Sequence, residues 1–277
     1  MIQLKKLKKK NFYHSYVIGR FSPMVGSKFQ HFPIDNWEND LKIAKKFNFD
    51  GTEWIISDYS NPIFNILFCK IIKQHLKKNN LKISSLSLDL IMDNPLHKIS
   101  TTDVEWLIKK LRILIKYFSI KRITIPIEER SRFNNYIEKN IALNRLKKFY
   151  LGIGRLCNLS IETDISPFSL KKLFNLKSLK KLGILLDIGN IRAHGFRVED
   201  YIKLFPNKIY GVHIKYRSEF YGKTARLKKN FKELKVLLGN INKLKNCRDI
   251  TFQTYKSNNN FFKDMEVSIN NFNKHVQ

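Results

Sequence analysis

The chain is poor in cysteine, proline, glycine and acidic residues. The shortage of cysteine excludes two kinds of small cross-linked protein, and the shortage of proline and glycine argues against a division into domains. Three widely spaced cysteines, Cys69, Cys157 and Cys247, fit neither a disulfide framework nor a zinc cluster. Seven prolines and eleven glycines in 277 residues form no flexible linker between domains. No apolar run reaches the roughly 18 residues of a membrane helix, and residues 1–13 lack the apolar core of a secretory signal. We expect one cytoplasmic domain over residues 1–277 and no membrane partner.

The fourth shortage, of acidic residues, leaves a net charge of +29, with 52 Lys and Arg against 23 Asp and Glu. Such a charge is typical of nucleic-acid binders, because cations on the protein replace the counterions of phosphate backbones. Here most basic residues are lysines spread along every helix-like segment, in a chain also rich in Asn and Ile, a skew expected of an A/T-rich coding sequence. We therefore do not expect nucleic acid as a partner, whereas an anionic small substrate stays open. Residues 1–11 form a basic arm whose composition is typical of disorder.

Short β-rich runs alternate with longer amphipathic segments, which predicts a parallel barrel. Strands are expected at residues 14–22, 49–57, 81–89, 120–128, 158–164, 183–190, 208–216 and 249–255. Helices are expected between them, among others at 36–47, 104–118, 231–245 and 261–275. Eight strand–helix units are the number that a single closed (β/α)8 barrel requires, with apolar strand interiors. An open doubly wound sheet is the alternative, but the chain lacks its Gly-rich phosphate loop after the first strand.

Polar side chains end several of the predicted strands. The apolar run ILL ends in Asp187, and Glu162, His213, Gln253 and Glu53 hold equivalent positions on other strands. In a parallel barrel the carboxyl ends of all strands open at one mouth, so we expect these side chains to converge. Carboxylate oxygens and an imidazole nitrogen together suit a divalent metal ion. The sequence therefore predicts a metal site at the mouth of the barrel.

Three motifs carry a resemblance to a known family: ETD (162–164), LLDIGNIRAHG (185–195) and GVHIKYR (211–217). They resemble the xylose-isomerase-like TIM barrels, which include sugar and sugar-phosphate isomerases and epimerases, inosose dehydratases and type-IV apurinic endonucleases. The resemblance follows the strand order over nearly the whole chain. Residues 19–33 and 44–55 also look like a subgroup associated with bacterial surface-sugar gene clusters. The resemblance implies an enzyme that acts on a sugar or sugar phosphate.

The resemblance also implies a mechanism with one divalent ion, Mn, Co, Mg or Zn. Its ligands would be Glu162, Asp187, His213 and, from the eighth strand, Gln253. In the family such an ion polarises a ketose carbonyl, so that a carboxylate removes a neighbouring carbon-bound proton and an enediolate forms. Glu162 would be that carboxylate. The implied function is a sugar or sugar-phosphate isomerase or epimerase, with surface-polysaccharide sugars as a candidate pathway.

Five further residues are candidates for contacts with the substrate: Asn190, Arg217, Lys215, Glu53 and Arg20. Lys215 matches the lysine of the family's seventh-strand pattern, and Arg217 matches a contact with a substrate oxygen. Instead of contacting the substrate, each of the two arginines could form an ordinary ion pair within the protein. Instead of contacting the substrate, Glu53 could form a hydrogen bond or ion pair that supports one of the metal ligands.

The ligand candidates have alternatives of their own. Asp187 is also placed to cap the helix that follows its strand. Glu162 is also placed to pair with one of the many lysines, and a lone histidine such as His213 is more often structural. The sequence leaves these alternatives open.

The chain departs from the family pattern where the eighth strand usually supplies Glu and the sixth supplies His. It has Gln253, a weak ligand that cannot remove a proton, and Asn190. Tyr216 also replaces an Asp of the seventh strand. We therefore expect a weakly bound ion and a one-base reaction, either aldose–ketose isomerisation or dehydration. The main alternative is a barrel that binds a sugar or partner without turnover.

Two other enzyme classes are less well matched. A DNA-repair endonuclease of this fold needs additional His ligands at the third and sixth strands, where the chain has SLSLD and DIGN. A Schiff-base aldolase would need a desolvated strand-end lysine, for which Lys215 is the candidate. Pairing of two barrels into a homodimer stays open.

Overall fold

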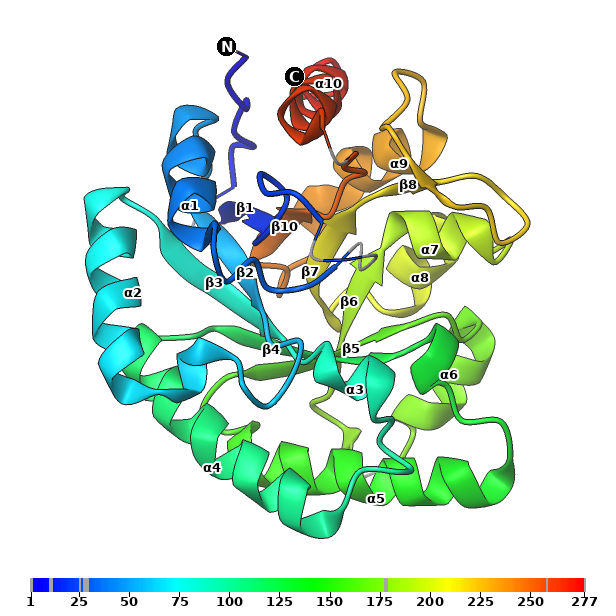
Figure 1. Cartoon of the computed structure of the whole chain (residues 1–277). Helices are drawn as coiled ribbons and strands as arrows, with labels where there is room; N and C mark the ends of the chain where they lie inside the picture. The colour runs from blue at the N-terminus through cyan, green and yellow to red at the C-terminus, as the bar shows by residue number, and fades with distance from the viewer. Residues whose placement is uncertain are drawn as a thin grey trace.

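The computed structural model describes residues 2–9, 12–24, 26, 30–176, 179–257 and 259–276, and these form a closed eight-stranded parallel barrel surrounded by helices (Figure 1). Around the barrel the strands follow the order β1-β10-β7-β6-β5-β4-β3-β2. The barrel strands are β1 (Tyr13–Val17), β2 (Gly51–Ile55), β3 (Lys82–Ser87), β4 (Arg122–Ile127), β5 (Asn158–Thr163), β6 (Gly183–Asp187), β7 (Ile209–Ile214) and β10 (Asp249–Phe252). All eight predicted strands are confirmed, although each ends earlier than predicted because its last polar residues already belong to the loops at the mouth.

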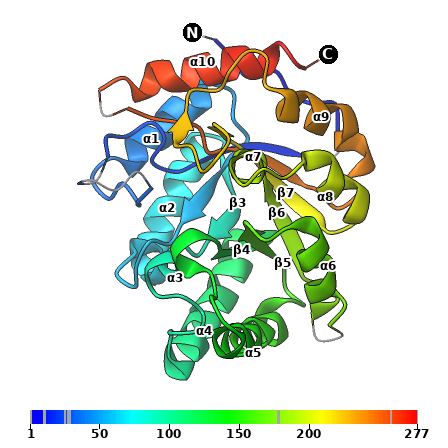
Figure 2. The same cartoon turned by 90° about the vertical axis from the view of Figure 1, so that its right-hand side faces the viewer.

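The helices lie outside the barrel (Figures 1 and 2). They are α1 (Trp37–Lys46), α2 (Ile66–Lys78), α3 (Leu90–Asp93), α4 (Thr101–Phe118), α5 (Tyr136–Ile153), α6 (Pro167–Phe174), α7 (Ile188–Ala193), α8 (Val198–Leu204), α9 (Lys232–Asn240) and α10 (Phe261–Asn273), with 3-10 turns η1 (Pro62–Phe64), η2 (Glu129–Ser131) and η4 (Ile241–Lys243). The helix predicted over 231–245 is divided into α9 and η4. Among the described residues, no helix is both long enough and apolar enough to span a membrane.

The interior of the barrel is polar near its centre, which corrects the expectation of apolar strand interiors. Arg122 begins β4, and its guanidinium reaches Asp249 on β10 at 2.6 Å and Glu53 on β2 at 3.0 Å. Neither strand neighbours β4, so these ion pairs cross the barrel. Ser85 on β3 donates to the same Glu53 oxygen that Arg122 binds, at 2.8 Å, and Arg122 also donates to Thr124. We call Arg122, Asp249, Glu53, Ser85 and Thr124 the interior cluster.

A glycine on β7 makes room for this cluster. A Cβ atom at Gly211 would lie 2.6 Å from Nε of Arg122 and 2.7 Å from Oδ1 of Asp249. Both distances are shorter than any tolerated contact, so a larger residue at this position would displace the buried ion pair. The glycine of the GVHIKYR motif therefore serves the packing of the barrel interior.

The described part of the basic N-terminal arm is held against the barrel. The backbone N–H of Leu4 donates to Phe47 at 3.0 Å, and the Leu4 side chain is 2% exposed. Lys6 forms an ion pair with Asp50, and Nζ of Lys9 donates to the carbonyl of Leu244 at 2.7 Å. Both views place the two ends of the chain beside α10 (Figures 1 and 2). Over residues 2–9 the arm therefore contacts the barrel and α10.

Candidate active site

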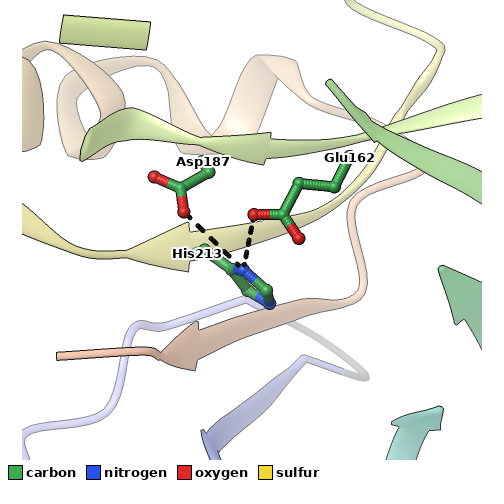
Figure 3. Close-up of side chains that lie close together, drawn as sticks. All are labelled: Glu162, Asp187 and His213. Atoms are coloured by element: carbon green, nitrogen blue, oxygen red, sulfur yellow. Dashed lines mark ion pairs between the residues drawn. The ribbon is translucent and has the colours of Figure 1, made fainter. Parts of the chain in front are cut away.

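Three predicted ligands meet where adjacent strands end. Asp187 on β6 pairs in register with His213 on β7, and Glu162 on β5 pairs with Leu185 on β6. Nδ1 of His213 lies 3.4 Å from Oε1 of Glu162 and 3.9 Å from Oδ2 of Asp187. Figure 3 shows both carboxylates directed at the imidazole. One donor atom from each residue lies within 4.8 Å of the others, and all three residues are buried, so this cluster could hold a metal ion.

The two oxygens of Asp187 have different surroundings. Oδ1 accepts the backbone N–H groups of Gly189 and Asn190, each at 2.8 Å, and so caps α7. Oδ2 is buried and accepts no hydrogen bond from the described residues, although Nζ of Lys215 lies 3.1 Å away as an ion pair. Nδ1 of His213 is also buried without a hydrogen bond from that part of the chain. Each atom has an ion pair, Oδ2 with Lys215 and Nδ1 with Glu162, but neither has a hydrogen bond from the described residues. Buried polar atoms normally have such bonds, so a divalent ion fits between these two ligand atoms.

Glu53 lies behind His213 and is 0% exposed. Its Oε1 is 2.7 Å from Nε2 of the imidazole, while Oε2 binds Arg122. This matches the ion-pair alternative for Glu53, and a fully buried carboxylate with both oxygens engaged leaves no surface for a substrate. A carboxylate on one ring nitrogen fixes the imidazole and directs the other nitrogen towards a metal.

The same contacts determine the charges of this pair. Burial alone would lower the pKa of His213, but the carboxylates of Glu53 and Glu162 outweigh burial and raise it to about 10. Burial alone would raise the pKa of Glu53, but His213 and Arg122 lower it to about 2. Without a metal the imidazole is therefore cationic, and a metal at Nδ1 would displace its proton.

Lys215 and Gln253 bond to one another beside this cluster. Nζ of Lys215 donates to Oε1 of Gln253 at 3.2 Å, and Nε2 of Gln253 donates to Oε1 of Gln30 at 2.8 Å. Burial lowers the pKa of Lys215, but the carboxylates of Asp187 and Glu128 outweigh it and raise the pKa, so the lysine is an ammonium. The carbonyl that would serve as a fourth ligand therefore faces a cation in this structure.

Asn190 and Arg217 also reach the site. Nδ2 of Asn190 donates to Oε2 of Glu128 at 2.6 Å and lies 3.4 Å from Oε1 of Glu162. Oδ1 of Asn190 accepts Nη1 of Arg217 at 2.8 Å, and the same Arg217 atom forms an ion pair with Glu129 at 2.9 Å. Arg217 therefore forms an ion pair within the protein, the alternative to a substrate contact, and its hydrogen bond to Asn190 orients that amide.

Arg20 contacts the site through another residue. It is 2% exposed, and its Nη2 donates to Oε1 of Gln30 at 2.7 Å. Gln30 in turn donates to Oδ2 of Asp89 at 2.5 Å. Nothing in the sequence pattern pointed to Gln30, which lies in a loop. Asp89 ends the predicted strand 81–89 and so carries the same signal that identified Asp187.

A cavity of about 520 Å³ opens at this mouth. Its acidic lining residues are Asp89, Asp93, Glu128, Glu129 and Glu162, against the cations of Arg130 and Lys215. The cavity is therefore rich in acidic groups although the chain has a net charge of +29. Burial raises the pKa of Asp89, Glu162 and Glu128, and the Glu162 carboxylate raises that of Glu128 further.

The eight-stranded closure and the interleaved helices define a (β/α)8 barrel, with the cluster of Glu162, Asp187 and His213 at the carboxyl ends of its strands. No protein-family model and no curated protein sequence matches the chain. Solved structures do match it, and they include xylose-isomerase-like TIM barrels, sugar isomerases or epimerases and a probable dehydratase.

Three of these structures illustrate the similarity. A sugar phosphate isomerase/epimerase from Parabacteroides distasonis is 12% identical, covers 99% of this chain and 100% of its own, and has a TM-score of 0.68. A xylose isomerase-like TIM barrel protein from Mycobacterium smegmatis in complex with magnesium is 14% identical, with coverages of 96% and 97% and a TM-score of 0.64. A D-allulose 3-epimerase from Methylomonas sp. in complex with D-allulose is 12% identical, with coverages of 99% and 97% and a TM-score of 0.64.

These comparisons confirm the predicted fold. The chain has the xylose-isomerase-like TIM-barrel fold over nearly its whole length. At these identities the likeness concerns the fold, and function has to be argued from the site.

Proposed function

We propose that the protein is a metal-dependent sugar isomerase or epimerase that transfers a carbon-bound proton. The observation that supports this most directly is the pair of buried donor atoms, Oδ2 of Asp187 and Nδ1 of His213, which lack hydrogen bonds from the described residues next to the Glu162 carboxylate. Each of these atoms has an ion pair, with Lys215 and Glu162 respectively, but burying a polar atom without a hydrogen bond is costly. A ligand between them would remove that cost, and their chemistry suits Mn, Co, Mg or Zn.

In this proposal Glu162, Asp187 and His213 hold the ion, and Gln253 is a weak neutral fourth donor. When bound, the ion polarises the carbonyl and hydroxyl oxygens of the sugar and acidifies the neighbouring C–H bond. Glu162 removes the proton from that carbon. Its buried carboxylate has a raised pKa, which makes it a better proton acceptor than an exposed one. The Lys215 ammonium stabilises the negative charge that forms on the substrate oxygen.

The charge of the cavity favours an uncharged sugar over a sugar phosphate. Glu128 accepts a hydrogen bond from Asn190, Asp89 accepts hydrogen bonds from Gln30 and Ser87, and Glu162 forms an ion pair with His213. Within the described residues, none of these three carboxylates has an ion pair with a lysine or arginine. Even with Glu128 protonated, a phosphate group beside the Glu162 and Asp89 carboxylates would be repelled in a site of low dielectric. We accordingly propose a free aldose or ketose as the substrate. A cytoplasmic role in surface-polysaccharide sugar metabolism is the setting that the sequence resemblance favours.

A sugar-binding barrel without turnover is the second candidate. Nζ of Lys215 lies 3.1 Å from Oδ2 of Asp187 and therefore places a positive charge where a metal would bind. Gln253 supplies no second base. In this case the cavity would bind a sugar, and the lysine would replace the ion electrostatically.

Turnover of free sugars with and without metal distinguishes the two candidates. The purified protein is stripped with chelator, reloaded with Mn²⁺, and incubated in D₂O with D-xylose, D-mannose, D-fructose and D-allulose. NMR then measures product formation and deuterium incorporation. We expect Mn²⁺-dependent exchange with at least one sugar, and a loss of about 100-fold or more in Glu162→Gln. Saturable sugar binding without exchange, with or without Mn²⁺, would contradict the enzyme and favour the binding barrel.

A further inference from the structure

We propose that Glu128 is a second catalytic residue, which pairs with Glu162 and transfers the oxygen-bound proton in a one-sided aldose–ketose isomerisation. This inference rests on the proposed function and goes beyond it, because it assigns a group to the second proton transfer and selects isomerisation over epimerisation. It also explains how the site works without a carboxylate at position 253.

The chain places the Glu128 carboxylate inside the cavity. Glu128 follows the last residue of β4, is 8% exposed, and lines the cavity together with Glu162. The next residue, Glu129, has a φ of +44°, and its N–H donates to Oδ2 of Asp164 at 3.0 Å. A non-glycine residue in the left-handed region is strained, and such strain is concentrated at functional sites. The chain thus turns sharply where Glu128 enters the cavity.

A single amide joins the two carboxylates. Nδ2 of Asn190 donates to Glu128 at 2.6 Å and is 3.4 Å from Glu162. An amide nitrogen carries two hydrogens, enough for one carboxylate each. Arg217 donates to Oδ1 of the same amide at 2.8 Å, which fixes its orientation with the nitrogen towards the carboxylates. Asn190 and Arg217 are therefore positioning residues for a pair of acid–base groups.

The remaining polar groups of the cavity are less suited to this role. Both polar atoms of the Gln253 side chain are engaged, by Lys215 and by Gln30, and an amide does not accept a proton at neutral pH. Both carboxylate oxygens of Asp89 accept hydrogen bonds, from Ser87 and from Gln30. Since Glu128 and Glu162 bond the same amide, the two proton-transfer groups lie on one side of the cavity. Epimerisation needs groups on both faces of a carbon, whereas a 1,2-shift needs only one.

The proposed steps balance. Glu162 takes the proton from C2 of the aldose, the C–H electrons form a C1–C2 double bond, and the carbonyl electrons move to O1. Glu128 gives its proton to O1, which yields an enediol. Glu162 then returns its proton to C1, and Glu128 takes the proton from O2 as the carbonyl forms at C2. The product is the ketose, and both carboxyl groups regain their starting states.

The test compares Glu128→Gln with wild type and with Glu105→Gln, an exposed matched control on α4 whose carboxylate pairs with Lys148. The Mn²⁺-loaded proteins are incubated with D-xylose, D-mannose and D-fructose in D₂O. Three quantities are measured: ketose–aldose interconversion, deuterium incorporation at carbon, and bound Mn²⁺. Gln keeps the acceptor for Asn190 but cannot transfer a proton, so a loss of activity at unchanged Mn²⁺ content reports on chemistry.

We expect Glu128→Gln to lower interconversion by about 100-fold or more, with unchanged Mn²⁺ content and thermal midpoint. Carbon-bound exchange should fall less than interconversion, because Glu162 still removes the proton. Interconversion within about 3-fold of wild type, or equal losses in activity and Mn²⁺ content, would overturn the role of Glu128 and leave the proposed function standing. Absence of exchange in wild type with every sugar would instead overturn the proposed function, and the role of Glu128 with it.

Discussion

The barrel contains two buried clusters of ionisable groups that differ in how completely their atoms are bonded. In the interior cluster Arg122 binds Asp249 through two nitrogens and also binds Glu53, and Ser85 completes the contacts. At the mouth, Oδ2 of Asp187 and Nδ1 of His213 have no hydrogen bond within the described chain. Both clusters bring buried carboxylates together with a cationic side chain. The difference in bonding separates a cluster that supports the fold from one that is suited to a ligand.

The two clusters share one contact, between Glu53 and His213 at 2.7 Å. The interior cluster therefore fixes the imidazole from behind, as the outer partner of a metal-binding histidine does. This arrangement predicts separable effects. Changes in the interior should alter stability, and changes at the mouth should alter binding.

The largest expected effect is on the free energy of unfolding, in Arg122→Met. Removing the guanidinium leaves Asp249 and Glu53 as buried carboxylates without their cation, which costs about 3–5 kcal/mol. Urea unfolding followed by circular dichroism measures the change. Arg112→Met on the exposed face of α4 is the control and should change the value by less than about 0.5 kcal/mol. A loss below about 1 kcal/mol in Arg122→Met would show that the interior cluster does not support the fold.

The next effect concerns the mouth, in Gln253→Glu. An additional carboxylate beside Glu162, Asp187 and His213 should strengthen Mn²⁺ binding about 10-fold, because ligand charge sets the affinity for hard cations. Calorimetric titration compares it with Gln74→Glu on the exposed side of α2, which adds the same charge far from the barrel interior. Equal Mn²⁺ affinities in the two variants would argue against a metal next to position 253.

A smaller effect on stability should distinguish the helix-capping role of Oδ1 of Asp187 from the role of its Oδ2 in ligand binding. Asp187→Asn keeps an oxygen that can cap α7, whereas Asp187→Ala removes the cap and costs about 1 kcal/mol of stability more than Asn does. Thermal unfolding of the metal-free proteins measures this difference. Equal stabilities of the Asn and Ala variants would mean that Oδ1 does not stabilise the helix.

A separate effect, which concerns Glu53 of the interior cluster, is a dependence of stability on pH. Glu53 has a pKa near 2 in the folded protein and an ordinary value of 4.5, because His213 and Arg122 outweigh its burial. A lowered pKa stabilises the fold above the ordinary value, and this contribution is lost as pH falls from 4.5 to 2. Glu53→Gln should therefore show a flatter decline in stability over that range. Parallel curves for the two proteins would contradict the ion pair.

Much of the fold could be predicted because each barrel strand is a short β-rich run between helical segments. Six of the eight strands end at or next to a polar side chain. The resemblance of ETD, DIGN and HIKYR to family motifs selected Glu162, Asp187 and His213. The predicted strands extend too far along the chain, because polar residues such as Asn190 and Gln253 continue the β-like pattern into the loops.

The interior cluster was not predicted, although strand alternation places Arg122 and Thr124 on one face of β4. Their partners come from β2 and β10, which lie across the closed barrel, so the pairing depends on closure. The role of Glu53 as a support for His213 and the contacts of Gln30 also depend on three-dimensional contacts. No spacing along the chain encodes them.

Titration of the metal-free protein with Mn²⁺, in parallel with Asp187→Asn, tests the central claim most directly. We predict one ion per chain in the wild type, with release of a proton from His213 that calorimetry in two buffers detects. Affinity should be at least about 100-fold weaker in Asp187→Asn, since even outer partners of a metal site cost 10–100-fold. Absence of binding in the wild type, or binding unaffected by Asp187→Asn, would contradict the assignment of the mouth cluster as a metal site.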